Sequence, residues 1–215
     1  MKKEISKTRI ILFIVAVISF IIHLFIYPKL PAQIPIQWSS TGEVNTYGAK
    51  YMDLVIAGIP VLIVPLMVIM PKIDPRKANY AKHGQAYTIA MTGITLLLIG
   101  CSWLSALSAL GYDVHIETVL SVAMGILFIA IGNSMPQIRS NYFFGIRTPW
   151  TLENPDVWRK THRFGGILFC IMGLLFIIGA FFKSEIFSTV LVVILAVGSV
   201  ALTYLYSYIL YRRLG

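Results

Sequence analysis

The sequence has little charge and few cysteines. Only 13% of its 215 residues are Asp, Glu, Lys or Arg, and 57% are hydrophobic, whereas soluble proteins carry about 25% charged residues. A soluble domain of this length would need a more polar surface, so the composition indicates a membrane protein. The two cysteines, Cys101 and Cys170, both lie within long apolar runs, and they therefore do not suggest an extracellular disulfide framework.

Ionisable residues are nearly absent from the apolar runs, with His23 as the exception. A proton-coupled or ion-coupled transporter would place acids or histidines at mid-depth, so this absence counts against that class. We favour a packing or interfacial role for His23. The other histidines are scattered over separate loops, and the chain lacks a nucleophile–base signature, a metal-ligand spacing and a glycine-rich phosphate loop. We therefore predict no enzyme activity, no catalytic residue, no metal site and no cofactor.

Six apolar stretches are long enough to cross a hydrocarbon core about 30 Å thick, which takes roughly 20 helical residues. Because the runs show no alternation with a period of two, helices are favoured over a barrel. The prediction is an all-α membrane protein with six transmembrane helices in a single integral membrane domain, residues 1–215. The predicted spans are Ile10–Tyr27, Leu54–Met70, Ala86–Leu110, Thr118–Asn133, Phe164–Phe182 and Phe187–Leu210.

The positive charge is distributed unevenly between the two sides of the predicted bundle. If the six helices alternate in direction, 15 of the 18 Lys and Arg residues lie on one side. This is the positive-inside pattern, and it predicts that both termini are cytoplasmic. It also predicts an extracytoplasmic loop at 28–52 and a cytoplasmic loop at 135–163. The net charge of +9 therefore reflects topology, and we do not expect direct nucleic-acid binding.

Glycines recur seven residues apart in three of the predicted spans. Two turns of helix bring such positions back to nearly the same face, so we predict close helix packing through small residues, with a ligand groove as the alternative. The pairs are Gly93 and Gly100, Gly125 and Gly132, and Gly166 and Gly173.

The second predicted span contains Pro60 and Pro65. Each proline removes a helical hydrogen bond and clashes with the preceding turn, so we expect this helix to be kinked or locally open. The kink is either an ordinary structural one or one that shapes a binding cavity or a moving element.

The outer segment 28–52 is too long and too patterned to be only a connector. Ile34, Ile36 and Trp38 alternate with other residues as in a short half-buried strand, and Ser39–Gly42 has the composition of a turn. Its aromatic residues are interpreted either as a belt at the headgroup level or as a recognition surface.

The inner loop contains two helix-start signals. Thr148 precedes Pro149, and Asn154 precedes Pro155 and Asp156, which places a capping residue before a proline at the first helical position. The second start predicts a helix through Trp158 to His162 that leads into the fifth span. On this helix Asp156 is placed to pair with Lys160.

The basic residues of this loop are typical of anchoring against anionic headgroups. That interpretation does not cover its remaining distinctive residues, which suggest a defined loop fold or a protein-docking surface. These residues are Asn141, Gly145, Thr148, Pro149, Trp150 and Trp158.

Three segments of the sequence resemble a known family. Asn141–Leu152, Val157–Arg163 and Gly165–Gly166 strongly resemble the signature loop of the SdpI immunity-protein family. The outer segment, from Ile34 through Gly42, Tyr47 and Lys50 to Pro60, is similar to the small domain of unknown function at the front of such proteins.

The resemblance implies a multi-pass protein of the bacterial cell membrane that protects its producer from a secreted, membrane-active peptide toxin. It also implies that the toxin-bound protein holds a small winged-helix repressor at the membrane. The partners expected on this basis are the peptide toxin, the repressor and the lipid bilayer. From the residues alone, a membrane-embedded enzyme or a transporter of lipids or amphiphiles is the alternative.

Two groups of site residues are predicted. The candidates for toxin binding on the outer side are Trp38, Gly42, Tyr47 and Lys50. The candidates for the cytoplasmic docking surface, chosen because arginine and aromatic residues anchor many interfaces, are Arg139, Asn141, Gly145, Arg147, Thr148, Pro149, Trp150, Trp158, Arg159 and His162.

Overall fold

The computed structural model describes residues 2–39, 42–182 and 185–214. Among these residues, six helices are long and apolar enough to cross a membrane, which confirms the predicted six-helix class. The long helices are α1 (Lys2–Ile26), α2 (Met52–Ile73), α3 (Tyr80–Ala109), α4 (Ile116–Ser134), α6 (Pro155–Gly179) and α7 (Glu185–Leu214). The short elements are η1 (Tyr27–Lys29), β1 (Gln33–Trp38), β2 (Val44–Ala49), η2 (Lys77–Asn79), η3 (Met135–Gln137) and α5 (Pro149–Glu153).

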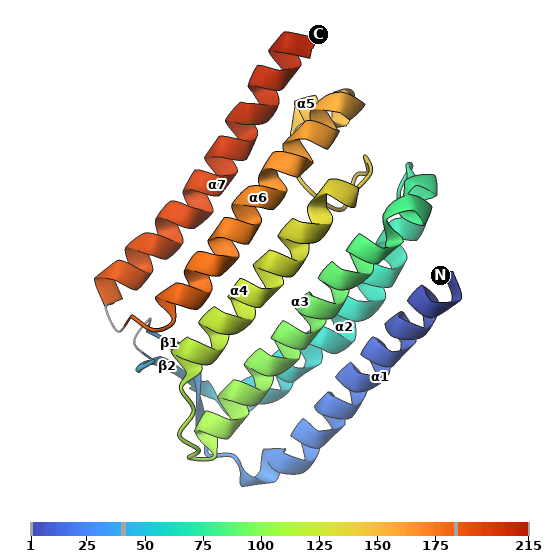
Figure 1. Cartoon of the computed structure of the whole chain (residues 1–215). Helices are drawn as coiled ribbons and strands as arrows, with labels where there is room; N and C mark the ends of the chain where they lie inside the picture. Colours follow the sequence, from blue (N-terminus) through green and yellow to red (C-terminus); the bar gives the residue numbers. More distant parts are fainter. Residues whose placement is uncertain (1, 40–41, 183–184, 215) are drawn as a thin grey trace.

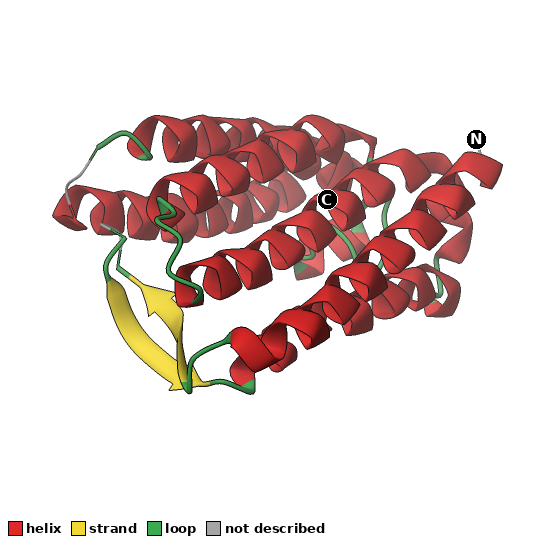
Figure 2. Cartoon of the chain, turned by 90° about the horizontal axis from the view of Figure 1, so that it is seen from below, coloured by secondary structure: helices red, strands yellow, loops and turns green. Residues whose placement is uncertain are grey.

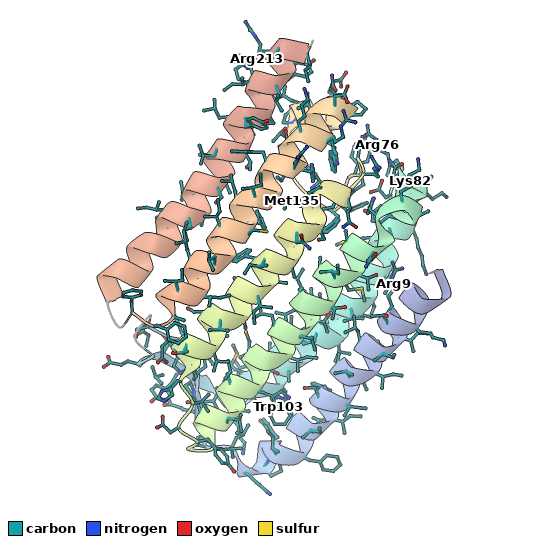
Figure 3. The ribbon with its side chains drawn as sticks, viewed as in Figure 1. Arg9, Arg76, Lys82, Trp103, Met135 and Arg213 are labelled. Atoms are coloured by element: carbon teal, nitrogen blue, oxygen red, sulfur yellow. The ribbon has the colours of Figure 1, made fainter. Side chains whose placement is uncertain are left out.

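The helices form a group of three followed by a row. Helices α1, α2 and α3 pack on one another, α3 contacts α4, α4 packs extensively on α6, and α6 contacts α7 (Figure 1). Both chain ends lie at the same end of the bundle as α5. Figure 3 places Arg76, Lys82 and Arg213 toward this end and Trp103 toward the opposite one. We call the first the basic end. The second, which carries β1, β2 and the connection between α3 and α4, is the hairpin end (Figure 2).

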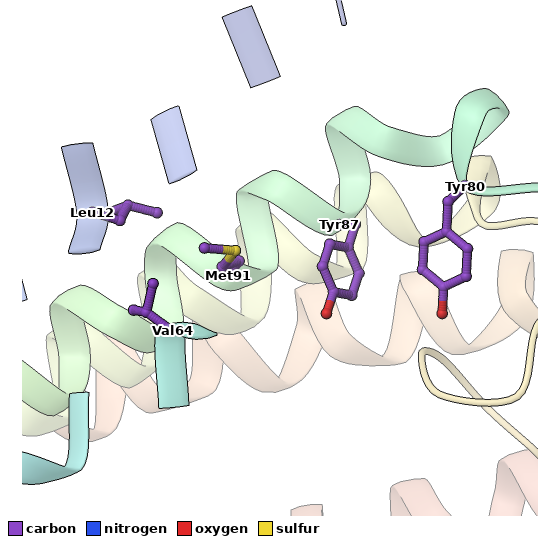
Figure 4. Close-up of a cluster of buried hydrophobic side chains, with 5 residues drawn as sticks. All are labelled: Leu12, Val64, Tyr80, Tyr87 and Met91. Atoms are coloured by element: carbon purple, nitrogen blue, oxygen red, sulfur yellow. The ribbon is translucent and has the colours of Figure 1, made fainter. Parts of the chain in front are cut away.

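The outward faces of the long helices are apolar. Large hydrophobic side chains are more than half exposed along α1 and α7, among them Ile10, Phe25, Ile194 and Val200. In water such exposed apolar faces would favour aggregation, whereas in a bilayer they contact acyl chains. Figure 4 shows an interior cluster of Leu12, Val64, Tyr80, Tyr87 and Met91, contributed by the first three helices.

The glycines of α4 and α6 form a close helix–helix seam. An added Cβ on Gly125 would lie 2.6 Å from the carbonyl oxygen of Gly173, and one on Gly132 would lie 2.6 Å from that of Gly166. Backbone therefore packs directly on backbone, and the predicted small-residue packing is confirmed for these four positions. Gly100 differs, because nothing lies within 4 Å of its Cβ position.

The prolines of the second span do not interrupt it. Helix α2 runs continuously from Met52 to Ile73 with Pro60 and Pro65 inside it, so the helix does not open locally, and the alternative of a kink stays a prediction. The break in helical geometry lies in α3 instead, where His83 has φ −125° and ψ 21°. Residues 80–82 therefore form a separate first turn of that helix.

The segment after α1 folds as a β-hairpin, which adds a small sheet to the predicted all-α fold. β1 and β2 pair antiparallel, with Gln33 opposite Ala49 and Trp38 opposite Val44. Ile34 is fully buried, so the predicted half-buried strand is confirmed. In the predicted turn, the Gly42 amide donates to the Ser39 carbonyl over 3.1 Å, while residues 40 and 41 lie outside the described part of the chain.

Candidate functional site

Asn141 is the centre of the loop between η3 and α5 at the basic end. Its buried amide donates over 2.9 Å to the carbonyls of Arg139 and Phe144, and its side-chain oxygen accepts from the amides of Phe143 and Phe144. An amide side chain has both donors and acceptors, so one residue satisfies both sides of a tight loop. Asn141 therefore holds the loop together from within.

Asp74 fastens this loop to the turn between α2 and α3. The buried carboxylate accepts from the backbone amides of Arg76 at 2.7 Å and Tyr142 at 2.9 Å. The Tyr80 hydroxyl lies 3.1 Å from both an Asp74 oxygen and the Asn141 side-chain oxygen, and it can donate to one of them at a time. The two loops are thus joined through neutral and charge-assisted hydrogen bonds.

His162 fastens the same loop to α6. Its Nδ1 lies 2.9 Å from the Trp158 carbonyl, and its Nε2 accepts from the Ile146 amide at 3.0 Å. A carbonyl can only accept, so the proton sits on Nδ1 and the ring is neutral. Gly145 has φ +106°, and an added Cβ there would overlap His162 Nε2. The Trp158 ring stacks on His162 and donates to the Ile138 carbonyl at 2.8 Å.

His83 marks the place where the loop meets the break in α3. Its Nδ1 accepts from the Arg139 amide at 3.2 Å, whereas its buried Nε2 has no hydrogen-bond partner among the residues that the structure describes. Its ring lies 4.7 Å from that of Tyr80 and 6.5 Å from that of Phe144. The irregular backbone at His83 thus coincides with the contact between α3 and the loop.

The two predicted helix starts are confirmed. Thr148 and Thr151 form a reciprocal capping box at α5, and Asn154 caps α6 through the amides of Asp156 and Val157. The Thr148 hydroxyl also bonds Ser207 of α7 at 3.0 Å, which ties this corner to the last helix. The predicted pairing of Asp156 with Lys160, in contrast, is wrong.

Asp156 pairs with Arg159 rather than with Lys160. The carboxylate lies 3.0 Å from the Arg159 guanidinium, three residues along the helix, and both side chains are more than 60% exposed. At the first turn of a helix the i,i+3 position is within reach of a short acidic side chain. The pair contributes little, because exposed ion pairs stabilise weakly.

The predicted docking residues fall into two groups according to exposure. Asn141, Thr148, Trp158 and His162 are buried, so they support the loop from inside. Trp150 is half-buried against Tyr204 and Tyr208 of α7. The exposed members are Arg139, Gly145, Arg147, Pro149 and Arg159.

The four predicted outer residues all lie on the hairpin but do not form one patch. Lys50, at one end, donates to the Pro28 carbonyl at 3.2 Å and lies over the Tyr27 ring. Gly42, at the other end, packs against Glu117 of α4. The two ends of β1 are five residue steps apart, or about 17 Å at the usual strand rise. Two tethers therefore hold the hairpin across the bundle, and a third comes from Ser105 of α3, which donates to the Pro35 carbonyl at 2.7 Å.

The hairpin end also contains a buried polar pair. His23 of α1 and Asp53 of α2 are both almost fully buried, with His23 Nδ1 3.0 Å from each carboxylate oxygen. The His23 ring lies 4.7 Å from Trp103 of α3, whose indole N–H donates to Ser19. Because the pair is protected from water, removing one member would leave the other unpaired in an apolar interior.

Sequence reasoning did not find this pair or Asp74. Asp53 stands immediately before the predicted second span, and Asp74 stands four residues after it. The positions of these residues in the sequence could have indicated the pair. Asp53, at the outer end of the second span, is at the same depth as His23 near the outer end of the first. Acids at such depths are costly unless partnered.

The fold and the two ends define a multi-pass helical membrane protein with a hairpin at one end and a polar loop network at the other. Residues 137–208 match the model of the SdpI/YfhL protein family, and residues 14–64 match that of a domain of unknown function, DUF1648. The chain is 31% identical to "Immunity protein SdpI" of Bacillus subtilis (strain 168) over 209 residues, covering 97% of this chain and 98% of the relative. It belongs to the SdpI/YfhL family, as the resemblance predicted. No solved structure matches it.

Proposed function

We propose that this protein gives a bacterial cell resistance to a secreted, membrane-active peptide toxin, and that it does so by binding rather than by catalysis. The supporting observation is the likeness to a relative named as an immunity protein, which extends over 97% of the chain. The aligned region includes the segments that form the hairpin and the basic-end loop here.

The proposal includes an orientation. Lys and Arg gather at the basic end, and membrane proteins keep such residues on the cytoplasmic side. The hairpin end then faces outward, toward an arriving toxin. A reporter that works only in the cytoplasm is expected to give a signal when it is fused after Gly215. A signal from a reporter that works only outside the cytoplasm would contradict this orientation.

The hairpin is the proposed site of recognition. Tyr47 and Tyr51 are 58% and 60% exposed, and amphipathic rings of this kind suit a peptide that is partly in the membrane interface. Contacts with η1, α3 and α4 hold the hairpin in place, so little ordering is needed on binding.

Survival of a toxin-sensitive host tests this proposal. Expression of the wild-type chain is expected to raise the tolerated toxin concentration, and Tyr47→Ala is expected to reduce that gain about tenfold because it removes an exposed aromatic anchor. Tyr112→Ala is the matched control, since Tyr112 is 63% exposed at the same end but lies outside the hairpin. No gain in survival at a verified membrane level of the wild-type protein would refute the immunity function.

The basic end is the proposed relay to a small winged-helix repressor. Exposed Arg139, Arg147 and Arg159, beside half-buried Trp150, would form the docking surface, while Asn141 and the other buried members position the loop. Signalling requires that toxin binding favour one of two loop arrangements by a differential free energy.

Membrane recruitment of the repressor tests the relay. Arg147→Ala is expected to lower the membrane-bound fraction, whereas Lys72→Ala, which removes an exposed cation at the same end, is not. Equal recruitment by the wild type and Arg147→Ala would rule out this docking role while leaving immunity intact.

A further inference from the structure

A polar pocket of about 370 Å³ lies at the basic end, outside the buried loop network. It is enclosed by the turn between α2 and α3, by residues 138–140 and by the corner between α5 and α6. Its polar lining residues include Arg76, Asn79, Arg139, Ser140, Glu153 and Arg159. Three arginines from three separate parts of the chain therefore line one cavity.

Arg76 is the best-fixed of these cations. Its half-buried guanidinium donates to the Ser140 hydroxyl and to the Leu152 carbonyl, and it lies 4.9 Å from the centre of the Tyr142 ring. These bonds leave further N–H donors free. Among the described residues, no carboxylate forms an ion pair with this guanidinium. The guanidinium is thus held in place by hydrogen bonds, while the nearby Asp74 carboxylate accepts from the backbone amide of Arg76 and from that of Tyr142.

The remaining charges do not neutralise the pocket. Arg139 is exposed, and its guanidinium makes no ion pair with the described acids. Arg159 pairs with Asp156 at 3.0 Å, but such an exposed pair exchanges readily for a stronger partner. Glu153 is the other acid in the lining, so three cations face two carboxylates.

The depth of the pocket matches that of lipid headgroups. Helix α3 has 30 residues and is therefore about 45 Å long, which equals the thickness of a bilayer including its headgroup layers. Asn79 immediately precedes this helix, and Arg159 lies in the second turn of α6. The pocket therefore sits where phosphate groups are, beyond the hydrocarbon core.

We propose that this pocket binds the phosphate group of a phospholipid headgroup. Guanidinium groups bond phosphate oxygens in a two-pronged geometry that lysine does not reproduce, and the volume falls within the usual range for small-molecule sites. A headgroup bound here contacts the α2–α3 turn and the α5–α6 corner together. The lipid therefore stabilises the relative position of the two segments that frame the basic-end loop. This proposal does not rest on toxin immunity, although Arg139 and Arg159 also belong to the proposed docking surface for the repressor.

Lipid binding by the full-length chain in detergent tests the proposal. The probe is short-chain phosphatidylglycerol, and binding is followed by native mass spectrometry and by the shift of the thermal unfolding midpoint. Arg139→Gln with Arg159→Gln is expected to weaken binding about tenfold, because two guanidinium contacts to phosphate are lost. Lys160→Gln with Arg163→Gln is the matched control, since it removes the same charge from exposed positions of α6 outside the pocket. The control is expected to weaken lipid binding less than about threefold, because it lowers only the overall positive electrostatic potential of this surface.

Two further probes identify the group that is recognised. A diacylglycerol with the same chains, which lacks the phosphate, is expected not to bind at this site. Competition by inorganic phosphate at millimolar concentration would support recognition of the phosphate group. It would also show that free phosphate is a second source of the bound group. Arg76→Lys, which keeps the charge but loses the planar fork, is expected to weaken lipid binding in a variant with unchanged folding. Equal losses in the two double variants, or equal binding of the diacylglycerol, would overturn the proposal.

Discussion

The two ends of the bundle are held together by different means. At the hairpin end, the buried pair of His23 and Asp53 joins α1 to α2, and three separate tethers hold the hairpin. At the basic end, many hydrogen bonds converge on Asn141, Asp74 and His162. The first arrangement concentrates its stability in one ionisable pair, whereas the second distributes it over a network.

The difference affects how each end responds to a mutation. A buried pair that loses one partner leaves a desolvated group without compensation, at a cost of about 3–5 kcal/mol. In a distributed network each hydrogen bond contributes about 1 kcal/mol, so a single loss is smaller. A single mutation should therefore lower the free energy of unfolding most at the His23–Asp53 pair of the hairpin end. Across the basic end, the losses should be smaller and more even.

The largest effect is expected from His23→Ala. It leaves the Asp53 carboxylate buried and unpaired, so the free energy of unfolding should fall by about 3–5 kcal/mol. His115→Ala is the control, because His115 is exposed at the same end. Thermal unfolding in detergent measures both. Replacing both members of the pair by leucine should recover much of the loss, and a double variant as unstable as the single one would contradict this account.

A smaller effect is expected when a glycine of the basic end is compared with one of the hairpin end. Gly145 and Gly111 both have positive φ, +106° and +87°, but only Gly145 faces a side chain, His162. Gly111→Ala should cost about 1–2 kcal/mol for backbone strain alone. Gly145→Ala adds an overlap that displaces His162, for a total of roughly 2–4 kcal/mol. Equal unfolding midpoints for the two variants would show that His162 does not constrain the loop.

The smallest effect is expected from Arg159→Ala. It removes a pair with Asp156 in which the side chains are 65% and 63% exposed, and such pairs contribute about 0.2–1 kcal/mol at most. The unfolding midpoint should match that of Lys160→Ala within error. A clearly larger loss would mean that the basic end also depends on an ion pair, and the contrast with the hairpin end would fail.

Local features of the fold could be predicted from the sequence, and contacts between distant segments could not. The starts at Thr148 and Asn154 are confirmed because capping depends on neighbouring residues alone. The same holds for the helix expected to lead from Asn154 into the fifth span, since α6 begins at Pro155 and continues to Gly179. His23 and Asp53 are 30 residues apart, and no local pattern joins them.

The docking residues show the same limit. Trp158, His162 and Gly165 follow one another at helical spacing in α6, but the sequence does not state whether that face points outward or into the bundle. Their composition suggested an interface. The structure buries them against residues 138–146, so the aromatic and histidine side chains serve the loop instead.

The glycine seam between α4 and α6 has a mechanical consequence. At Gly125 and Gly132 the two backbones approach closely, and the side chains of Ile177 and Cys170 pack against the same positions, so the helices interlock and have little room to slide. The two helices should tilt as one lever. Glu117, at the hairpin end of that lever, touches Gly42, and Trp158 lies near its other end, so a push on the hairpin turn would reach the basic end as a rigid-body rotation.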